Sequence, residues 1–146
     1  MDAPQEKGSI CYQVAEEIAP QDRETVRQGL REYNLPRWED THAAELNVLA
    51  RDPQGQIQGG ILAETHGKWL EIEFLWVAEG YRGQKIGSRL LQYAEEEARA
   101  RGCQYAFLNT LDFQAPEFYP RFGYREVFAL EEFPRTGRKT FFIKNL

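Results

Sequence analysis

This 146-residue chain has little of what several functional classes require. Its two cysteines and two histidines are too few, and too far apart in sequence, for a disulfide framework or a zinc site. No apolar run approaches the ~20 residues that a membrane-spanning helix needs. The first ten residues, MDAPQEKGSI, contain no apolar stretch typical of a signal peptide. We therefore expect a cytoplasmic protein that binds neither a metal nor a membrane.

Positive charge is also scarce. Lysine and arginine total 18 against 23 aspartate and glutamate residues, which gives a net charge of −5. A nucleic-acid-binding protein needs a basic face, so this balance argues against a nucleic-acid partner. It weakly favours a cationic amine as substrate. The cations that do cluster, at Arg82, Lys85 and Arg89, suit a local anion.

Apolar periodicity predicts one domain over residues 9–146, preceded by a flexible tail over residues 1–8. Alternation predicts strands over residues 10–14, 46–51, 56–64, 69–77, 105–110, 124–130 and 140–146. Helical spacing predicts helices over residues 21–34 and 87–101, and a short one around residues 118–122. In the second helix we expect an apolar stripe that comprises Ile86, Leu90, Leu91, Ala94 and Ala98. We expect its outward-facing residues to be Arg89, Gln92, Glu95, Glu96 and Arg99.

The most informative segment lies over residues 70–87, where an apolar strand runs into a turn of glycines and cations that opens a helix. The first N–H groups of a helix have no intrahelical partner, and the helix dipole favours an anion beside them. Gly83 and Gly87 allow close backbone approach, while Arg82 and Lys85 add charge. The segment lacks the Gly-Lys-Ser/Thr ending of a P-loop. It therefore predicts a diphosphate site without nucleotide-hydrolysing chemistry; the alternative is a tight connection that binds nothing.

Two motifs resemble the GNAT superfamily of acetyltransferases. RGQKIG, over residues 82–87, is similar to the acyl-coenzyme A loop Gln/Arg-x-x-Gly-x-Gly/Ala, with Lys85 at the place of the middle glycine. APEFYPRFGY, over residues 115–124, is similar to the segment Ala-x-x-Leu/Phe-Tyr-x-x-x-Gly-Phe/Tyr. The resemblance implies an α/β (α+β) fold with a mixed, mostly antiparallel central sheet, a parallel splayed strand pair and helices on both faces.

The resemblance also implies N-acetyl transfer from acetyl-coenzyme A (acetyl-CoA) to a primary amine of a small molecule or peptide, by direct attack. The expected cofactor contacts are Leu75, Trp76, Val77, Arg82, Gly83, Gln84, Lys85, Ile86, Gly87, Ser88, Asp112 and Tyr119. Over residues 75–77 the main chain is expected to make them, because the pantetheine arm adds there like a short strand. Asp112 stands where the superfamily often has asparagine and cannot donate a hydrogen bond while ionised. Its alternatives are a helix cap and a contact to a cationic substrate.

Two proton transfers accompany this reaction. The amine must lose a proton, and because its pKa lies near 10.4, holding it neutral at pH 7 costs roughly 4 kcal/mol. Glu71 and Glu73 lie two apart on the strand before the loop, hence on one face. In the superfamily a glutamate on this strand often serves as the base, and we favour Glu73 over Glu71. Tyr119 matches the tyrosine that protonates the leaving thiolate, although Pro120 follows it directly.

Two alternatives to acetyl transfer stay open. One is a non-catalytic, regulatory domain that binds acyl-CoA, and the other is an acyltransferase for a longer acyl group. Whether a glutamate and Tyr119 meet in one cleft discriminates the first from an enzyme. We also expect a homodimer, because the last strands carry Phe133, Phe141, Phe142 and Ile143, more apolar surface than a small edge sheet needs.

Overall fold

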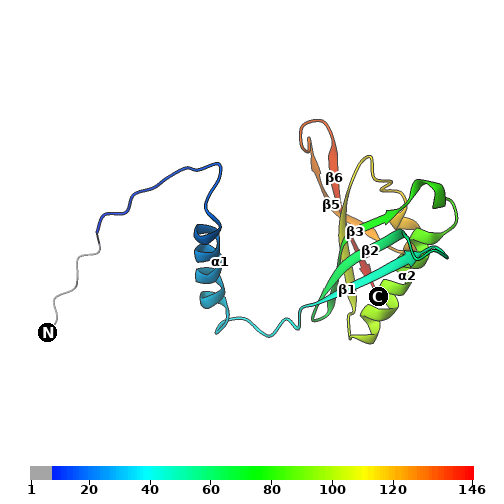
Figure 1. Cartoon of the computed structure of the whole chain (residues 1–146), viewed down its shortest axis with the longest axis horizontal. Coiled ribbons are helices and arrows are strands. Elements are labelled where there is room, and N and C mark those ends of the chain that lie inside the picture. Colours follow the sequence, from blue (N-terminus) through cyan, green and yellow to red (C-terminus); the bar gives the residue numbers. More distant parts are fainter. Residues whose placement is uncertain (1–7) are drawn as a thin grey trace. The chain divides into compact units, whose positions relative to one another are not determined.

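The computed structural model describes residues 8–146, and the chain divides into two compact units, one up to Glu39 and one over Asp40–Leu146 (Figure 1). The first unit contains α1 (Pro20–Asn34), which confirms the helix predicted over residues 21–34. The strand predicted over residues 10–14 is wrong: this stretch is irregular, and no strand among the described residues pairs with its backbone. Apart from Gly8, the tail expected over residues 1–8 lies outside the described residues.

The second unit is built on a six-stranded mixed sheet in the order β1-β2-β3-β4-β6-β5. Its strands are β1 (Ala44–Arg51), β2 (Ile57–His66), β3 (Trp69–Val77), β4 (Tyr105–Leu111), β5 (Arg125–Glu131) and β6 (Arg138–Asn145). All neighbours are antiparallel except β3 and β4, whose parallel pairing is as predicted. The helical crossover between β3 and β4 makes that pair parallel, and hairpins join β1 to β2, β2 to β3 and β5 to β6. The last strand, β6, lies between β4 and β5, which leaves β5 at the edge.

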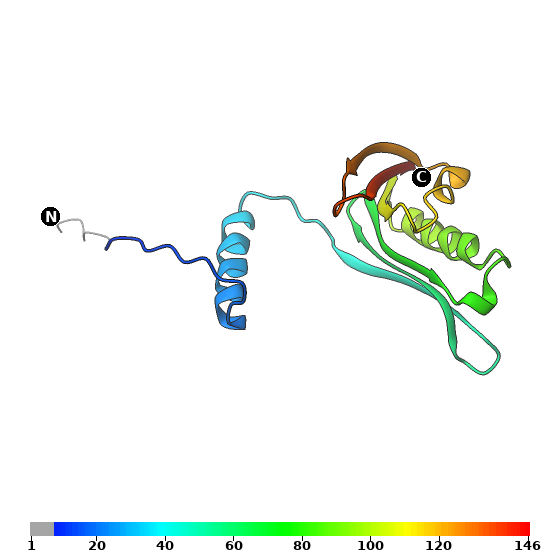
Figure 2. The same cartoon turned by 90° about the horizontal axis from the view of Figure 1, so that it is seen from above.

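Helix α2 (Ile86–Ala100) lies along one face of the sheet and packs on β1, β2 and β3 (Figure 2). The apolar stripe predicted from the sequence forms the helix side of the core, with the exception of Ile86, which is only partly buried. The strand side of this core includes Leu46, Ile61, Leu70, Ile72, Ala106 and Leu108. One prediction about α2 is wrong: the side chain of Glu95 is buried and does not face outward. Within residues 8–146 no helix is long and apolar enough to cross a membrane.

Gly59 brings α2 close to the backbone of the sheet. A Cβ at this position would lie 3.1 Å from the carbonyl oxygen of Trp76, 3.3 Å from Ile86 and 3.4 Å from Leu90. Contacts this short are tighter than packed side chains tolerate. The glycine therefore sets the distance between β2 and the first turns of α2.

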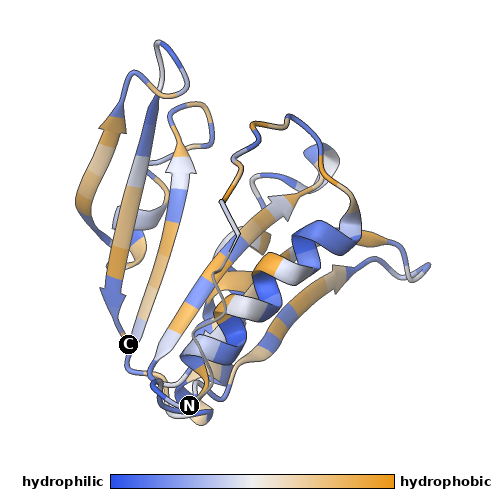
Figure 3. Ribbon diagram, turned by 90° about the vertical axis from the view of Figure 1, so that its left-hand side faces the viewer, coloured by the Kyte–Doolittle hydropathy of each residue, from blue (hydrophilic) through white to orange (hydrophobic). Residues whose placement is uncertain are grey.

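Strands β3 and β4 part soon after they meet. Only Trp69–Glu71 pairs with Tyr105–Phe107, and beyond these residues the two strands diverge (Figure 3). Close to the parting point β3 has a bulge: Leu62 of β2 pairs with Phe74 and Ala63 with Ile72, so Glu73 is the extra residue. A bulge bends its strand and increases the local twist. Residues 72–77 of β3 are thus free of β4 on that edge.

Candidate functional site

The segment between β3 and α2 forms an open helix start. It comprises the short 3-10 helix η1 (Glu79–Tyr81) and a loop in which Arg82 donates from Nε to the carbonyl oxygen of Val77 at 3.2 Å. Within the described residues no side chain caps the first N–H groups of α2. These N–H groups and the positive end of the helix dipole are therefore available to an anion.

Lys85 adopts the backbone conformation that a glycine would. Its φ is 63°, in the left-handed region, and Gly83 has a φ of 79°. Holding a non-glycine residue there costs roughly 1–2 kcal/mol. The lysine thus preserves the shape of the predicted loop while it adds an amine to it. Its carbonyl oxygen accepts hydrogen bonds from Ser88 Oγ at 2.9 Å and from the N–H of Arg89 at 3.1 Å.

A pocket of about 540 Å³ opens at this helix start. Its walls are formed by Val77, Tyr81, Arg82, Gly83, Lys85, Ile86, Gly87, Ser88, Phe118, Arg121 and Phe122. The loop thus contributes two cations to the pocket wall, Arg82 and Lys85, and a second segment of the chain contributes a third, Arg121. Uncapped N–H groups together with these cations and apolar walls fit a ligand that carries both phosphate and organic groups. We call this cavity the donor pocket.

Several predicted contact residues lie in this pocket and others do not. Val77, Arg82, Gly83 and the run 85–88 line it, whereas Leu75, Trp76, Gln84, Asp112 and Tyr119 do not. Asp112 lies in the turn after β4, where its N–H donates to the carbonyl oxygen of Arg138 at 3.1 Å. A Cβ on Gly137 would lie 3.2 Å from its carboxylate. Asp112 therefore packs against the loop before β6.

Four residues of the pocket wall were not predicted from the sequence. Tyr81 comes from η1, and Phe118, Arg121 and Phe122 come from the segment around η2 (Tyr119–Phe122). The guanidinium carbon of Arg121 lies 5.7 Å from the centre of the Phe118 ring. The signal for Arg121 was its place inside the second motif, two residues after the tyrosine. Its partners in the loop become apparent only once the fold brings the two motifs together.

The two glutamates lie on β3 outside the donor pocket. Leu70 precedes Glu71, Ile72 lies between the two glutamates, and both apolar side chains are buried in the core. Glu71 and Glu73 therefore occupy the opposite face, as their spacing predicts. The carboxylate of Glu71 lies 3.4 Å from His66 Nε2. Glu73 has no ion-pair partner among the described residues, and it is the bulge residue where β3 leaves β4.

Tyr119 lies behind the pocket wall. Only 9% of its surface is exposed, and its ring centre is 5.1 Å from that of Phe118, which lines the pocket. Burial raises the pKa of Tyr119. The phenol therefore keeps its proton at neutral pH. Neither Tyr119 nor a glutamate lines the donor pocket or the apolar pocket beside β5 and β6. No cluster of three metal-ligating side chains occurs in residues 8–146.

Comparison with known proteins identifies relatives of this chain. The model of the Acetyltransferase (GNAT) family matches residues 11–124. An acetyltransferase of Agrobacterium fabrum is 37% identical over 105 residues, which cover 72% of this chain and 77% of that protein. A blasticidin-S acetyltransferase of Streptomyces morookaense is 38% identical over 94 residues, or 64% of this chain and 69% of that protein. A crystal structure of an acetyltransferase from Bacillus cereus superposes with a TM-score of 0.83 and 32% identity, covering 92% of this chain and 98% of that one.

Gly87 offers a direct test of the donor pocket. A Cβ at this position would lie 3.6 Å from Phe118 and 3.8 Å from Val77, both of which are wall residues. We expect coenzyme A to bind the parent protein with a micromolar Kd, and Gly87→Asp to weaken it roughly 10- to 100-fold. The reason is that the added carboxylate repels the phosphates. Two like charges about 4 Å apart repel by about 1 kcal/mol in bulk water and by about 4 kcal/mol near a protein surface. Isothermal titration calorimetry measures both constants.

The matched control is Gly87→Ala, which adds the Cβ without the charge. Alanine in a helix is more stable than glycine by about 0.5–1 kcal/mol, so a loss of affinity in this variant cannot come from unfolding. We expect a loss smaller than that of Gly87→Asp. An unchanged Kd in a folded Gly87→Asp protein would contradict the assignment of the pocket.

Proposed function

The chain belongs to the Acetyltransferase (GNAT) family, and we propose how its residues carry out that chemistry and on which class of amine. It is an N-acetyltransferase that takes its acetyl group from acetyl-CoA and acts on an amine. The observation that carries our proposal is the donor pocket, where the uncapped start of α2 lies beside Arg82, Lys85 and Arg121. Bound acetyl-CoA supplies the acetyl group as a thioester, which an amine can attack directly.

Two features of the chain fit this donor. The N–H groups at the start of α2 and the three cations would hold its phosphates. Residues 72–77 of β3 have no partner on β4, which leaves backbone donors and acceptors on that edge for the amide-rich pantetheine arm. In this assignment Leu75, Trp76 and Val77 contribute through their main chain, and Gly83, Gln84 and Ser88 through the loop and the helix start.

We assign the base to Glu73. It is the bulge residue where β3 parts from β4, at the end of the strand segment along which the pantetheine arm would lie, and no ion pair occupies its carboxylate in the described part of the chain. Bulges beside active sites redirect side chains in this way. Glu71 is the second candidate, but its carboxylate already faces His66 at 3.4 Å. Glu73 would accept the amine proton directly or through one water molecule.

We assign the acid to Tyr119. Its raised pKa keeps the phenol protonated and ready to donate. The same shift makes the phenol a weaker acid, so proton transfer to a thiolate depends on close placement and on electrostatic stabilisation of the phenolate. Its ring is held by Phe118, Tyr124 and Phe142, whose ring centres lie 5.1, 5.9 and 6.0 Å away. A fixed donor of this kind contributes through its position.

For the acceptor we propose the primary amine of a small molecule, in preference to a peptide. The relative named for blasticidin S supports this choice, as does the excess of acidic residues in the chain. We predict that a panel of small amines contains a substrate with kcat/KM of at least about 10⁴ M⁻¹s⁻¹. The panel is screened with acetyl-CoA and free thiol release as the readout. Acetylation of peptides alone would overturn the acceptor class, and coenzyme A binding without thiol release would favour a non-catalytic domain.

Substitution of the acid–base pair gives distinct pH profiles. We expect Glu73→Gln and Tyr119→Phe each to lower turnover by ~10²–10⁴-fold at pH 7 with little change in coenzyme A affinity. Glu73→Gln should recover as the pH approaches 10, because the amine then deprotonates without a base. Tyr119→Phe should not recover, because the missing group is a proton donor. In the parent, the raised pKa of Tyr119 means that its ionisation does not reduce activity below about pH 10.

Glu71→Gln is the internal comparison for these variants, since it removes the neighbouring carboxylate of the same strand face. The larger loss of the two glutamate variants identifies the base. If all three variants stay within about threefold of the parent, catalysis by proximity with water as the base is the better account.

We also propose a homodimer that buries the apolar face of β4, β5 and β6. This face surrounds a pocket of about 300 Å³ lined by Trp69, Phe107, Leu108, Val127, Phe128, Phe141, Phe142 and Ile143. Phe128 stacks on Phe141 with ring centres 4.3 Å apart. Phe142, expected in the interface, reaches this pocket but belongs to the core, because only 3% of it is exposed and its ring lies 6.0 Å from that of Tyr119.

Sedimentation tests the dimer. At tens of micromolar we expect a species of twice the 17.0 kDa chain mass, about 34 kDa, and its loss in Phe128→Lys, because a charge in an apolar interface is costly. Ile57→Lys is the control, because Ile57 is exposed and lies on β2, away from β4, β5 and β6 in the strand order. A 17.0 kDa monomer alone at these concentrations would remove the proposal.

A further inference from the structure

We propose that Glu95 of α2 is a positioning residue for Tyr119, and that its buried carboxylate holds the segment over residues 119–124 in the place that catalysis requires. The inference rests on the proposed function, in which Tyr119 is the acid. Glu95 touches neither the donor pocket nor the two candidate bases, so its role would be exerted through other residues.

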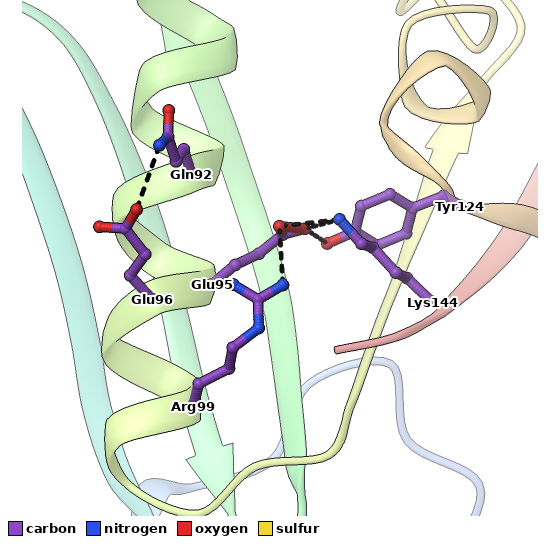
Figure 4. Close-up of polar contacts among 6 residues, drawn as sticks. All are labelled: Gln92, Glu95, Glu96, Arg99, Tyr124 and Lys144. Atoms are coloured by element: carbon purple, nitrogen blue, oxygen red, sulfur yellow. Dashed lines mark hydrogen bonds and ion pairs between the residues drawn. The ribbon is translucent and has the colours of Figure 1, made fainter.

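The carboxylate of Glu95 joins three elements. Its Oε1 accepts a hydrogen bond from the hydroxyl of Tyr124, just before β5, at 3.0 Å (Figure 4). Lys144 of β6 donates from Nζ to both carboxylate oxygens at 2.9 Å. Arg99, one turn further along α2, approaches to 3.9 Å. The side chain of Glu95 is 7% exposed and that of Lys144 18%.

We infer that the buried carboxylate of Glu95 fixes the positions of the segments that contact it more than it stabilises the folded state. Burial of a charge is costly unless the charge is paired, and apolar residues of similar size often stabilise a core equally well or better. Both donors must therefore reach Glu95 for the fold to tolerate it. Burial and the charge of Glu95 raise the pKa of Tyr124, so its hydroxyl remains protonated and donates.

Both donors are coupled to Tyr119. The N–H of Tyr124 donates to the carbonyl oxygen of Tyr119 at 3.3 Å, and the two rings lie 5.9 Å apart. Lys144 is two residues after Phe142, whose ring lies 6.0 Å from that of Tyr119. The Lys144 side chain also lies against Gly123, where a Cβ would be 3.4 Å from its Cε. Displacement of either donor would therefore move the support of the Tyr119 ring.

A double-mutant cycle between Tyr124 and Tyr119 tests this role. Tyr124→Phe removes one oxygen and keeps the ring. We expect it to lower kcat about tenfold, as a small misplacement of a catalytic group does, while KM for acetyl-CoA and the Kd for coenzyme A stay within about twofold. In the Tyr119→Phe background the same change should lower kcat by less than about twofold, because the group that it positions is already absent.

Two further variants complete the design. Lys144→Met removes the other donor and should reproduce the loss in kcat, so the result does not depend on Tyr124 alone. Glu96→Gln is the matched control, because Glu96 is the neighbouring glutamate of α2 and is exposed. Among residues 8–146 its one side-chain hydrogen bond is accepted from the exposed Gln92, at 3.1 Å (Figure 4). We expect its kcat and KM to equal those of the parent. Thermal unfolding of every variant identifies any that fails to fold.

The outcomes separate the two claims. If Tyr119→Phe lowers kcat but the loss from Tyr124→Phe is absent or fully additive to it, the positioning role of Glu95 is wrong and the proposed acid stands. If Tyr119→Phe leaves kcat unchanged, the proposed acid itself is wrong, and the positioning role falls with it. A non-additive cycle with an unaffected Glu96→Gln supports both.

Discussion

The direct packing of α2 on the sheet is the constraint on which the site depends. Gly59 removes the side chain that would separate β2 from the first turns of the helix, and Ile86 and Leu90 occupy that space. The helix therefore starts beside the end of β3, where its uncapped N–H groups face a loop that carries Arg82 and Lys85. The same arrangement leaves the far half of β3 without β4 as a partner. The proposed phosphate site and the open strand edge thus both follow from the packing of α2 on the sheet.

Two residues break a local rule within this arrangement. Lys85 takes up a left-handed backbone conformation that glycine adopts at lower cost, and Glu95 places a carboxylate in the core side of an amphipathic helix. Local conflicts of this kind concentrate at functional or strained sites. At Lys85 the compensation is a charge at the helix start, and at Glu95 it is a set of hydrogen bonds that reaches β6 and the segment after η2. Both residues lie on α2 or at its start.

Much of the fold could be predicted from the sequence because its signals are local. The alternation of β1 to β3 and the apolar stripe of α2 gave the elements within about two residues, and the crossover rule gave the parallel pair. The failures concern information that is not local. The stretch over residues 10–14 alternates like a strand, but a strand exists only where another pairs with it. The helical spacing predicts that Glu95 faces outward. Its burial is possible because Tyr124 and Lys144, far along the chain, donate hydrogen bonds to its carboxylate.

The candidate site could be proposed from local signals only in part. The loop over residues 82–88 was found from its glycines and cations, whereas the pocket wall from residues 118–122 required the tertiary fold. The bulge at Glu73 depends on the register of β2 against β3, which alternation alone does not specify. The spacing of Glu71 and Glu73 therefore placed both on one face but could not show which of them lies where the strands part.

The central claim is that the start of α2 and the open edge of β3 together hold the acetyl donor. A crystal structure of the protein with coenzyme A tests it most directly. The account predicts the diphosphate on the N–H groups of residues 83–88, the pantetheine arm along residues 75–77, and the sulfur between Glu73 and the hydroxyl of Tyr119. Coenzyme A bound away from the start of α2, or a sulfur that neither Tyr119 nor a glutamate of β3 can reach through one water molecule, would contradict it.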